Sequence, residues 1–317
     1  MADIIFAFVV LHYNEPKVTE KCVKAIRENT KKHSSEIVIV DNCSPDGSGG
    51  YLEKKYKDQP HITVLKAEKN LGFARGNNIG YTYAKQTLHA DYICVMNNDV
   101  LLLQPDFIER IVQEYETSKC GIVGPHITLL NGYTNYMYLK IHTREYFEHE
   151  LQMSKQMYRY YTSRLYPVRN IINRTLDKLL PALKFQKQPV KETLDDKIQM
   201  VIASKQRHKN IVLHGCCLIL TPLYIGKFDT AFDDRTFMFR EEELLYLRCR
   251  KHEIETVYEP SIDILHLEDM STNATFKKDC KREAFKNKCQ IDSLQILLEE
   301  LCLLYTSPSP RDYAASR

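Results

Sequence analysis

The sequence of 317 residues lacks the signatures of several common protein classes. None of its ten cysteines forms a C-x-x-C pair, which argues against a zinc-cluster protein. No apolar segment reaches the roughly 20 residues that a membrane-spanning helix needs. The net charge is only +3, so the composition does not indicate nucleic acid or another polyanion as a general partner. These absences leave a globular protein of one large α/β domain, or of one domain with a sizeable insertion.

The cysteines and the first apolar run indicate where the protein is expected to reside. Scattered thiols suit a reducing cytoplasm. The apolar run 4–11 has no Lys or Arg before it and no small-residue cleavage site after it. It therefore predicts a buried strand rather than a signal peptide, and we expect a cytoplasmic protein.

Short apolar runs alternate with helical patterns over the first third of the chain. We expect strands at 4–11, 37–40, 62–65 and 92–96, and helices at 18–29, 74–86 and 106–118. This order predicts an α/β fold with a mixed, mostly parallel sheet flanked by helices. Ligands of such sheets bind beyond the carboxyl ends of the strands. Six polar residues fall at these ends and predict one shared cleft: Tyr13, Asn14, Asp41, Asn97, Asn98 and Asp99.

The middle of the chain, residues 132–210, has a weaker periodicity and accumulates Tyr, Lys and Arg. Between Leu151 and Lys191, nine cations accompany a single acid, Asp177, and apolar residues recur at roughly helical spacing. A basic amphipathic helix of this kind is favoured at an anionic membrane surface. A helical insertion packed on the main domain with a solvated basic face explains the pattern equally well.

The last third returns to α/β character, with short strands expected at 256–258 and 262–265. The end of the chain differs. Residues 302–312 read CLLYTSPSPRD, which resembles the translation of a sequencing adapter. We expect the natural chain to diverge after about Leu301; a Pro/Ser-rich disordered tail is the alternative.

Two strand ends carry candidate ligand-binding acids. Asp41 follows an apolar strand, where a carboxylate can accept a hydrogen bond from the imide N–H of uracil or thymine, or can cap a turn. Asp99 follows Asn97 and Asn98 at another strand end. Mg²⁺ and Mn²⁺ take oxygen ligands and need few protein carboxylates when phosphate and water complete the shell. A turn rich in Asn and Asp is the alternative.

Residues 70–80 read NLGFARGNNIG, with three glycines at a spacing of four. This is not the G-x-G-x-x-G dinucleotide fingerprint. On a helix the glycines lie close to one face and allow a tight backbone approach, and Arg75 is suited to a diphosphate. A helix start packed closely on the sheet is the alternative.

Three acids at 241–243 open an expected helix that closes with cations at 248–251. The pattern either complements the helix dipole or supplies a general base, which must come within about 3 Å of an acceptor hydroxyl. His266 ends an apolar strand and is either structural or a metal ligand beside Asp99.

Taken together, these segments resemble family 2 glycosyltransferases of the GT-A fold, especially the rhamnosyltransferase-like branch. The resemblance covers about 4–125 and 213–272. It rests on a strand ending in Tyr-Asn, a V-D-N-x-S loop, an N-x-G-F-x-x-G-N-N-x-G stretch, a degenerate D-x-D, an acidic helix start and a strand ending in His. These match Tyr13-Asn14, Val40–Ser44, Asn70–Gly80, Asn97–Asp99, Phe237–Arg248 and Pro260–Thr272.

The resemblance implies an inverting transfer of a sugar, rhamnose among the candidates, from a UDP- or dTDP-sugar. The acceptor would be a saccharide or lipid-linked saccharide in cell-surface polysaccharide synthesis, at the inner face of the membrane. Glu242 would be the base, with Glu241 beside it, and Mg²⁺ or Mn²⁺ would bind Asp99 and His266. The expected nucleotide-sugar contacts are Tyr13, Asn14, Asp41, Asn70, Gly72, Arg75, Asn77, Asn78, Asn97 and Asn98.

Two departures from the family pattern keep other interpretations open. Asn97 replaces an acid, which leaves Asp99 as the one carboxylate for a metal, and Leu244 replaces another acid. Both favour a non-catalytic saccharide- or membrane-binding relative. A nucleotidyltransferase is a further alternative, although residues 12–17 (HYNEPK) lack its Gly/Arg/Lys-rich loop.

We therefore divide the chain into four parts. Residues 1–131 would form the nucleotide-sugar half and 211–301 the acceptor and catalytic half. Residues 132–210 would be the basic, Tyr-rich helical insertion and 302–317 the adapter-like tail.

Overall fold

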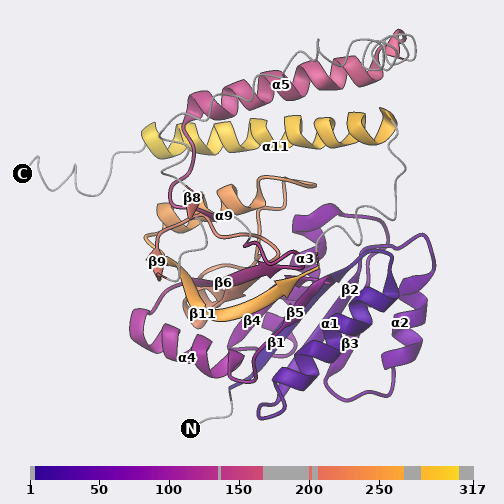
Figure 1. The fold of residues 1–317 in the computed structure, drawn as a ribbon, viewed down its shortest axis with the longest axis vertical. Helices are drawn as coiled ribbons and strands as arrows, with labels where there is room; N and C mark the ends of the chain where they lie inside the picture. The colour runs from indigo at the N-terminus through magenta and orange to yellow at the C-terminus, as the bar shows by residue number, and fades with distance from the viewer. Residues whose placement is uncertain (1–3, 135–136, 167–199, 202–205, 268–279, 307–317) are drawn as a thin grey trace, which may run out of the picture.

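The computed structural model describes residues 4–134, 137–166, 200–201, 206–267 and 280–306. A twisted sheet with helices on both faces forms the larger part, and two long helices form a separate layer at one end (Figure 1).

Within these residues the main sheet has nine strands, in the order β3-β2-β1-β4-β10-β6-β11-β5, with β9 paired to β11. Their bounds are β1 Phe6–His12, β2 Ser35–Asp41, β3 Ile62–Lys66, β4 Tyr92–Asn97, β5 Val100–Leu102, β6 Ile122–Leu129, β9 His208–Lys209, β10 Cys217–Leu220 and β11 Thr256–His266. Strands β3, β2, β1 and β4 run parallel. Strand β10 lies antiparallel between β4 and β6, so β6 and its parallel neighbour β11 share the direction of the first four. The predicted mixed, mostly parallel sheet is confirmed.

The strands expected at 256–258 and 262–265 form one strand, β11, with a register shift between Glu259 and Asp263. The expectation of two separate strands was wrong, because the chain stays paired with β6 on both sides of Pro260. Proline removes one backbone donor, and here the irregularity accommodates it while the strand continues to pair with β6 on either side.

The sheet is covered by α1 (Pro16–Asn29), α2 (Ser48–Tyr56), α3 (Gly72–Gln86), α4 (Phe107–Ser118), α8 (Pro222–Lys227) and α9 (Glu241–Lys251). The inner strands are apolar along their length because both faces are covered, and residues 6–10 are fully buried. Helix α3 lies very close to the sheet. A Cβ added at Gly80 would lie 2.3 Å from Val9 Cγ1, and one at Gly76 would lie 2.8 Å from Leu11 Cδ1. The glycine spacing therefore serves tight helix–sheet packing.

The two long helices, α5 (Arg144–Thr162) and α11 (Cys280–Thr306), run side by side (Figure 1). They share a second hydrophobic cluster with α9: Phe147, Leu244, Leu247, Leu294, Leu297 and Leu301. A short ribbon of β7 (Met137–Tyr138) and β8 (Met200–Val201) completes the described elements. The helical layer is thus joined to the sheet domain through the helix that carries the three acids.

Two expectations fall partly outside the described residues. The basic segment continues through 167–199, and the final residues are 307–317. Helix α11 extends to Thr306, so the first residues of the expected tail continue a helix. The division into four parts stays a prediction. None of the described helices combines the length and hydropathy needed to span a bilayer.

Candidate active site

Asp41 lies buried at the end of β2, where the donor base is expected. Its Oδ1 accepts hydrogen bonds from the backbone N–H of Ser44, at 3.1 Å, and from the Ser44 hydroxyl. The other oxygen faces the start of α2, since a Cβ added at Gly49 would lie 1.8 Å from Oδ2. Asn14 joins this loop by donating its N–H to Ser44 Oγ at 2.9 Å. One oxygen of Asp41 therefore caps the turn, and Asn14 holds the same turn from β1.

Asn42 fixes the turn that leads into α3. Its Nδ2 donates to Asn70 Oδ1 (3.2 Å) and to the Gly72 carbonyl (2.9 Å), and its Oδ1 accepts from the Leu71 N–H at 2.9 Å. We did not single out Asn42 from the sequence, although it stands beside Asp41 in the matched loop. It places two predicted donor contacts, Asn70 and Gly72, next to the end of β2.

Gly72 and Phe73 connect this turn to the loop before α9. Gly72 has φ +79°, and a Cβ there would lie 2.0 Å from the Phe237 carbonyl oxygen. The Phe73 N–H donates to that same oxygen at 2.7 Å. Only glycine combines the left-handed backbone with so close an approach, so Gly72 ties the first half of the chain to the acidic helix.

Three other predicted donor contacts on α3 make internal contacts. The Asn78 amide exchanges two hydrogen bonds with the Phe232 backbone, at 3.0 and 2.9 Å. Asn77 Nδ2 donates one turn back along its own helix, and its buried Oδ1 has no hydrogen-bond partner. Arg75 is exposed and donates through Nε to the Asp234 carbonyl at 2.6 Å. Asn78 and Arg75 anchor the loop 228–237, and the role of all three in donor binding stays a prediction.

His12 is a buried residue that our sequence reasoning missed. Its Nδ1 lies 2.7 Å from Thr19 Oγ1 and its Nε2 lies 2.8 Å from Ser48 Oγ. Ser48 donates its hydroxyl proton to Asp46, so Ser48 Oγ must accept from a protonated Nε2. Burial lowers the pKa of His12, although the nearby charges of Asp41 and Asp46 act to raise it. The lowered pKa favours the neutral ring, and the hydrogen bond to Ser48 places its proton on Nε2.

The same network continues toward Asp99. Thr19 Oγ1 accepts from Asn98 Nδ2 at 3.0 Å. Asn98 precedes Asp99, and His12 is the last residue of β1. The network thus connects the loop after β2 with the turn between β4 and β5. The sequence signal that could have identified His12 is its position as a polar residue at the end of a buried strand.

Asp99 and His266, the two predicted metal ligands, lie together. Asp99 Oδ1 is 3.3 Å from His266 Nε2, and both side chains are buried. Asp99 Oδ1 accepts no hydrogen bond. Within the part of the chain that the structure describes, no group of three or more His, Cys, Asp or Glu side chains is arranged to hold a metal. One carboxylate and one imidazole fit a cation that takes its remaining ligands from a diphosphate and water.

His214 stands beside this pair and was also missed. The ring centroids of His214 and His266 are 6.0 Å apart. Burial, followed by the nearby His266, lowers the pKa of His214 to about 4. Its Nδ1 accepts the Cys216 N–H at 3.1 Å, so the neutral ring carries its proton on Nε2. A lone histidine before a Gly-Cys-Cys segment has no sequence pattern that marks it.

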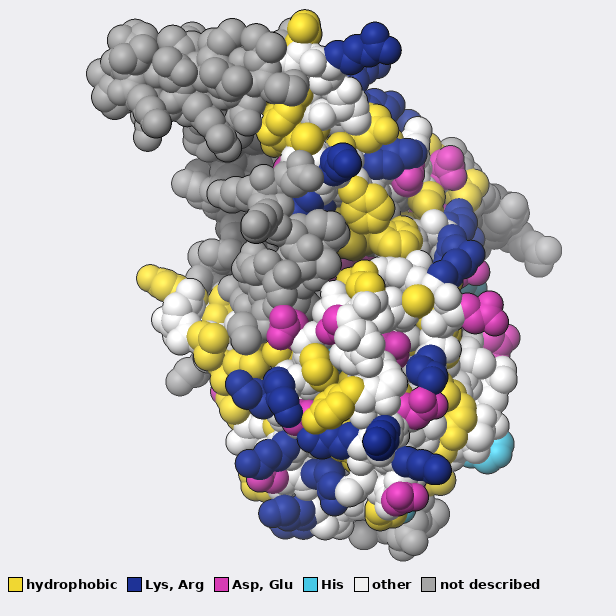
Figure 2. Space-filling model, turned by 90° about the vertical axis from the view of Figure 1, so that its right-hand side faces the viewer, with side chains coloured by type: hydrophobic (Ala, Val, Ile, Leu, Met, Phe, Trp, Pro, Cys, Tyr) yellow, Lys and Arg dark blue, Asp and Glu magenta, His cyan; other side chains and the backbone are white. Residues whose placement is uncertain are grey.

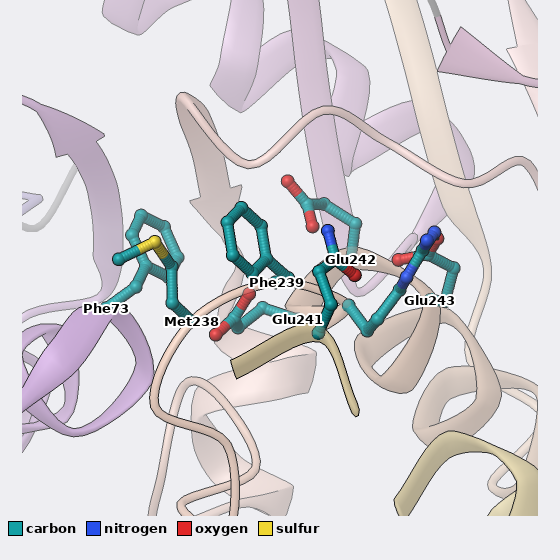
Figure 3. Close-up of a pocket in the computed structure, with 8 residues that line it drawn as sticks. Phe73, Met238, Phe239, Glu241, Glu242 and Glu243 are labelled. Atoms are coloured by element: carbon teal, nitrogen blue, oxygen red, sulfur yellow. The ribbon is translucent and has the colours of Figure 1, made fainter. Parts of the chain in front are cut away.

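The acids at the start of α9 occupy a polar pocket of about 310 Å³. Figure 3 shows Glu241 reaching toward the side formed by Phe73 and Met238, whereas the carboxyl group of Glu242 points upward in the view, away from that of Glu241. The Gly215 N–H donates to Glu242 Oε1 at 3.1 Å. Desolvation, followed by the charge of Glu243, raises the pKa of Glu242 to about 7. Desolvation, followed by the charge of Glu242, raises the pKa of Glu241 to about 8.

Arg240 fixes the start of α9. It pairs with Glu243 at 2.9 Å and with Glu150 of α5, and its guanidinium lies 5.6 Å from the Phe147 ring centroid. Phe239 and Arg240 both have left-handed backbones, with φ of 76° and 67°. Such conformations cost about 1–3 kcal/mol each and persist where the surroundings hold them. Here α5 holds them through Glu150 and Phe147.

Glu242 and the Asp99–His266 pair meet at the dipeptide His214-Gly215. His214 lies against His266, and Gly215 holds Glu242. A Cβ at Gly215 would lie 2.5 Å from Glu242 Oε1, so a side chain there would displace the carboxylate. A carboxyl group with a pKa near neutrality and a candidate cation site thus adjoin one short segment, an arrangement that could supply a general base and charge stabilisation.

Part of the chain is similar to known proteins. The family described as "Glycosyl transferase family 2" matches residues 7–176. Glycosyltransferase GlyG of Streptococcus pneumoniae serotype 4 is 28% identical over 136 residues, 43% of this chain and 41% of GlyG. A Haemophilus influenzae protein called an uncharacterized glycosyltransferase is 26% identical over 129 residues, 41% of this chain and 36% of its own. The chain therefore spans about two fifths of the length of these relatives.

Solved structures of S. aureus TarS are also similar. The fragment 1–349 has a TM-score of 0.48 at 11% identity, over 94% of this chain and 70% of that fragment. The same fragment in complex with UDP-GlcNAc has a TM-score of 0.35 at 16% identity, over 45% and 43%. The sheet of the present structure and the match over more than half of the sequence agree on the fold class and on the family: the chain belongs to glycosyl transferase family 2.

Proposed function

We propose that this chain is a metal-dependent, inverting glycosyltransferase in which Glu242 is the general base. The observation that carries the proposal is that Glu242, with its raised pKa, accepts a hydrogen bond from Gly215, and that the preceding residue, His214, lies beside His266 of the Asp99–His266 pair. A base with a pKa near neutrality is effective for proton abstraction at physiological pH.

In the proposed reaction, Glu242 takes the proton of an acceptor hydroxyl. The freed oxygen forms a bond to the anomeric carbon as the bond from that carbon to the diphosphate oxygen breaks, with inversion. The nucleoside diphosphate leaves with its electron pair, and no covalent enzyme intermediate forms. Mg²⁺ or Mn²⁺ held by Asp99 and His266 would neutralise the leaving diphosphate.

The donor in this proposal is a UDP- or dTDP-sugar, with rhamnose among the candidate sugars. Asp41 is the residue proposed to accept the imide N–H, through the oxygen that does not cap the Ser44 turn. The buried loop contacts of Asn14 and Asn42 support this, because they fix the loop around Asp41 before the donor binds. The acceptor is a saccharide or lipid-linked saccharide in cell-surface polysaccharide synthesis.

We further propose that the chain is cytoplasmic and contacts anionic lipid at the inner face of a membrane, which attracts basic surface segments. Figure 2 shows Lys and Arg gathered over the half that carries α1 and α2. A groove of about 720 Å³ there is lined by Lys17, Lys21, Lys24, Arg27, Lys31 and Lys55, with Glu20 and Glu28 between them. Flotation with liposomes of phosphatidylglycerol and of phosphatidylcholine tests the contact; equal partitioning would contradict it.

A non-catalytic relative is the second candidate, favoured by Asn97 and Leu244. The structure gives Leu244 another role, since it is buried in the cluster shared with α11. Leu244 therefore packs against the helical layer, and its side chain does not line the pocket. Leucine in place of an acid at this position does not remove a polar group from the pocket.

Product analysis separates these candidates. The chain is incubated with Mn²⁺, a panel of UDP- and dTDP-sugars and a mixture of saccharide acceptors, and the released products are identified. Free nucleoside diphosphate together with a glycosylated acceptor supports the proposal. Pyrophosphate would indicate a nucleotidyltransferase, and donor binding without turnover would indicate a non-catalytic relative.

A further inference from the structure

We infer that the pocket between α9 and α11 binds an uncharged sugar ring of the acceptor, and that Gln290 of α11 helps to select it. The inference rests on the proposed function, because it identifies the substrate class of the same site. It concerns a helix that lies beyond residues 7–176, the part of the chain that matches the family.

Three buried polar atoms in the pocket lining have no hydrogen-bond partner: Glu241 Oε1, Gln290 Oε1 and Arg240 Nε. Glu241 is only 4% exposed, and Figure 3 shows it directed along the pocket toward Phe73 and Met238. Buried polar atoms are normally paired, and an unpaired one needs an explanation. A ligand that supplies the missing partners provides it.

The missing partners are hydroxyl groups rather than charged groups. A hydroxyl both donates and accepts, so neighbouring hydroxyls can serve two oxygen acceptors and one N–H donor together. A phosphate or carboxylate would face Glu243 and, above its pKa of about 7, Glu242, and like charges in a partly desolvated pocket repel strongly. A cationic ligand would lie beside the Arg240 guanidinium, whose own charge is already matched by Glu243 and Glu150.

The apolar part of the lining fits the same ligand. Phe73 and Phe239 supply rings, and Met238 supplies a flexible thioether. Small-molecule sites are commonly apolar surfaces with a few placed polar groups. A sugar ring presents C–H groups on its faces and hydroxyls at its edge, which matches rings on the wall and polar atoms of Glu241, Gln290 and Arg240 around it.

Helix α11 holds Gln290 at this position from both sides. Ser293, one turn further along, donates its hydroxyl to the Met238 carbonyl at 2.9 Å. Phe285, on the preceding turns, packs edge-on against Phe237 with centroids 5.7 Å apart. Gln290 is thus fixed against the loop that leads into α9, and its amide can discriminate between acceptors.

Binding experiments on the whole chain test the inference. Ligand-observed NMR measures the methyl glycosides of glucose, galactose, mannose and N-acetylglucosamine, with and without saturating UDP and Mn²⁺, and glucose 6-phosphate as the charged counterpart. Gln290→Leu removes the amide at similar size. Asn287→Leu is the matched control, because Asn287 is an amide on the same helix that bonds to the Glu283 carbonyl and does not line the pocket.

We expect at least one methyl glycoside to bind, also in the presence of UDP, and to bind more tightly than glucose 6-phosphate. Gln290→Leu should weaken that binding by roughly fivefold or more, whereas Asn287→Leu should not, and both should keep the wild-type affinity for UDP. Binding of no glycoside, tighter binding of glucose 6-phosphate, or equal affinity in Gln290→Leu would each overturn the inference. Absent UDP affinity in the wild type, with the Gln290 effect intact, would instead contradict the proposed donor and leave the sugar pocket supported.

Discussion

The two sides of the cleft differ in how their polar groups are satisfied. On the donor side, Asp41, Asn42, Asn98 and His12 are hydrogen-bonded to neighbouring loops, whereas Asp99 Oδ1, at the proposed metal site, and Asn77 Oδ1 have no hydrogen-bond partner. On the α9 side, Glu241 and Gln290 keep unpaired oxygens, and two carboxyl pKa values are raised. We interpret the donor side as a largely preformed frame for the proposed donor. The α9 side is a pocket whose unpaired polar atoms can bind a substrate. The following experiments test that contrast, from the largest expected effect to the smallest.

Glu242→Gln removes the proposed base while keeping its size and its bond from Gly215. Transfer should fall by at least about 100-fold, the usual contribution of general base catalysis, and the affinity for UDP in calorimetry should stay within about twofold of wild type. The control is Glu241→Gln, which should retain more activity. Turnover at the wild-type rate in Glu242→Gln would remove this residue from the role of base.

Asp99→Asn tests the donor side at its metal end. Removing a residue that only hydrogen-bonds to a metal ligand commonly lowers metal affinity by roughly 10- to 100-fold. Asp99 is a proposed ligand itself, so loss of its carboxylate should abolish most of the Mn²⁺-dependent gain in UDP affinity. Calorimetry with and without Mn²⁺ measures that gain. The same replacement at Asp106, which pairs with Arg110 at the start of α4, is the control. An unchanged gain in Asp99→Asn would exclude Asp99 from the metal site.

Gly80→Ala tests whether the frame depends on close packing of α3. The added methyl group would lie 2.3 Å from Val9 and 2.8 Å from Val40. Overpacking of this kind costs about 1–3 kcal/mol, measured as the free energy of unfolding in urea. Gly50→Ala is the control, because nothing lies within 4 Å of its added Cβ. Equal stability of the two variants would show that the helix adjusts without strain.

Glu241→Gln should change the pH dependence of stability. The pKa of Glu241 is raised to about 8 in the folded protein, so the folded state binds a proton that the unfolded state releases above its ordinary pKa. The wild type therefore loses stability as pH rises toward 8, and the variant does not lose that share. The difference in melting temperature should grow in favour of Glu241→Gln between pH 5 and pH 8. Replacement of exposed Glu53 is the control, and a gap that stays constant would contradict the raised pKa.

The sequence predicted the frame better than the pocket. Buried strands such as 4–11 and 92–96 have continuous apolar runs, and the residues at their ends share one edge because the strands are parallel. Gly72 was matched by its motif, although its contact with Phe237 depends on a loop 165 residues away.

The pocket was less visible because it is built by long-range packing. Gln290 and His214 stand in no periodic pattern, and helix α11 gains its place through long-range contacts with α5, α9 and the loop before α9. The amide of Asn78 belongs to a matched motif, yet the structure shows it anchoring Phe232. A motif located the residue, but only the fold showed what its side chain contacts.

The pH dependence of sugar transfer tests the central claim most directly. The proposed base must be ionised to accept a proton, and the pKa of Glu242 is about 7. Single-turnover rates with saturating donor should rise about tenfold per pH unit below that value and level off above it, and Glu242→Gln should lose this limb. A rate that is flat between pH 5 and pH 9, or a limb that remains in Glu242→Gln, would contradict the account.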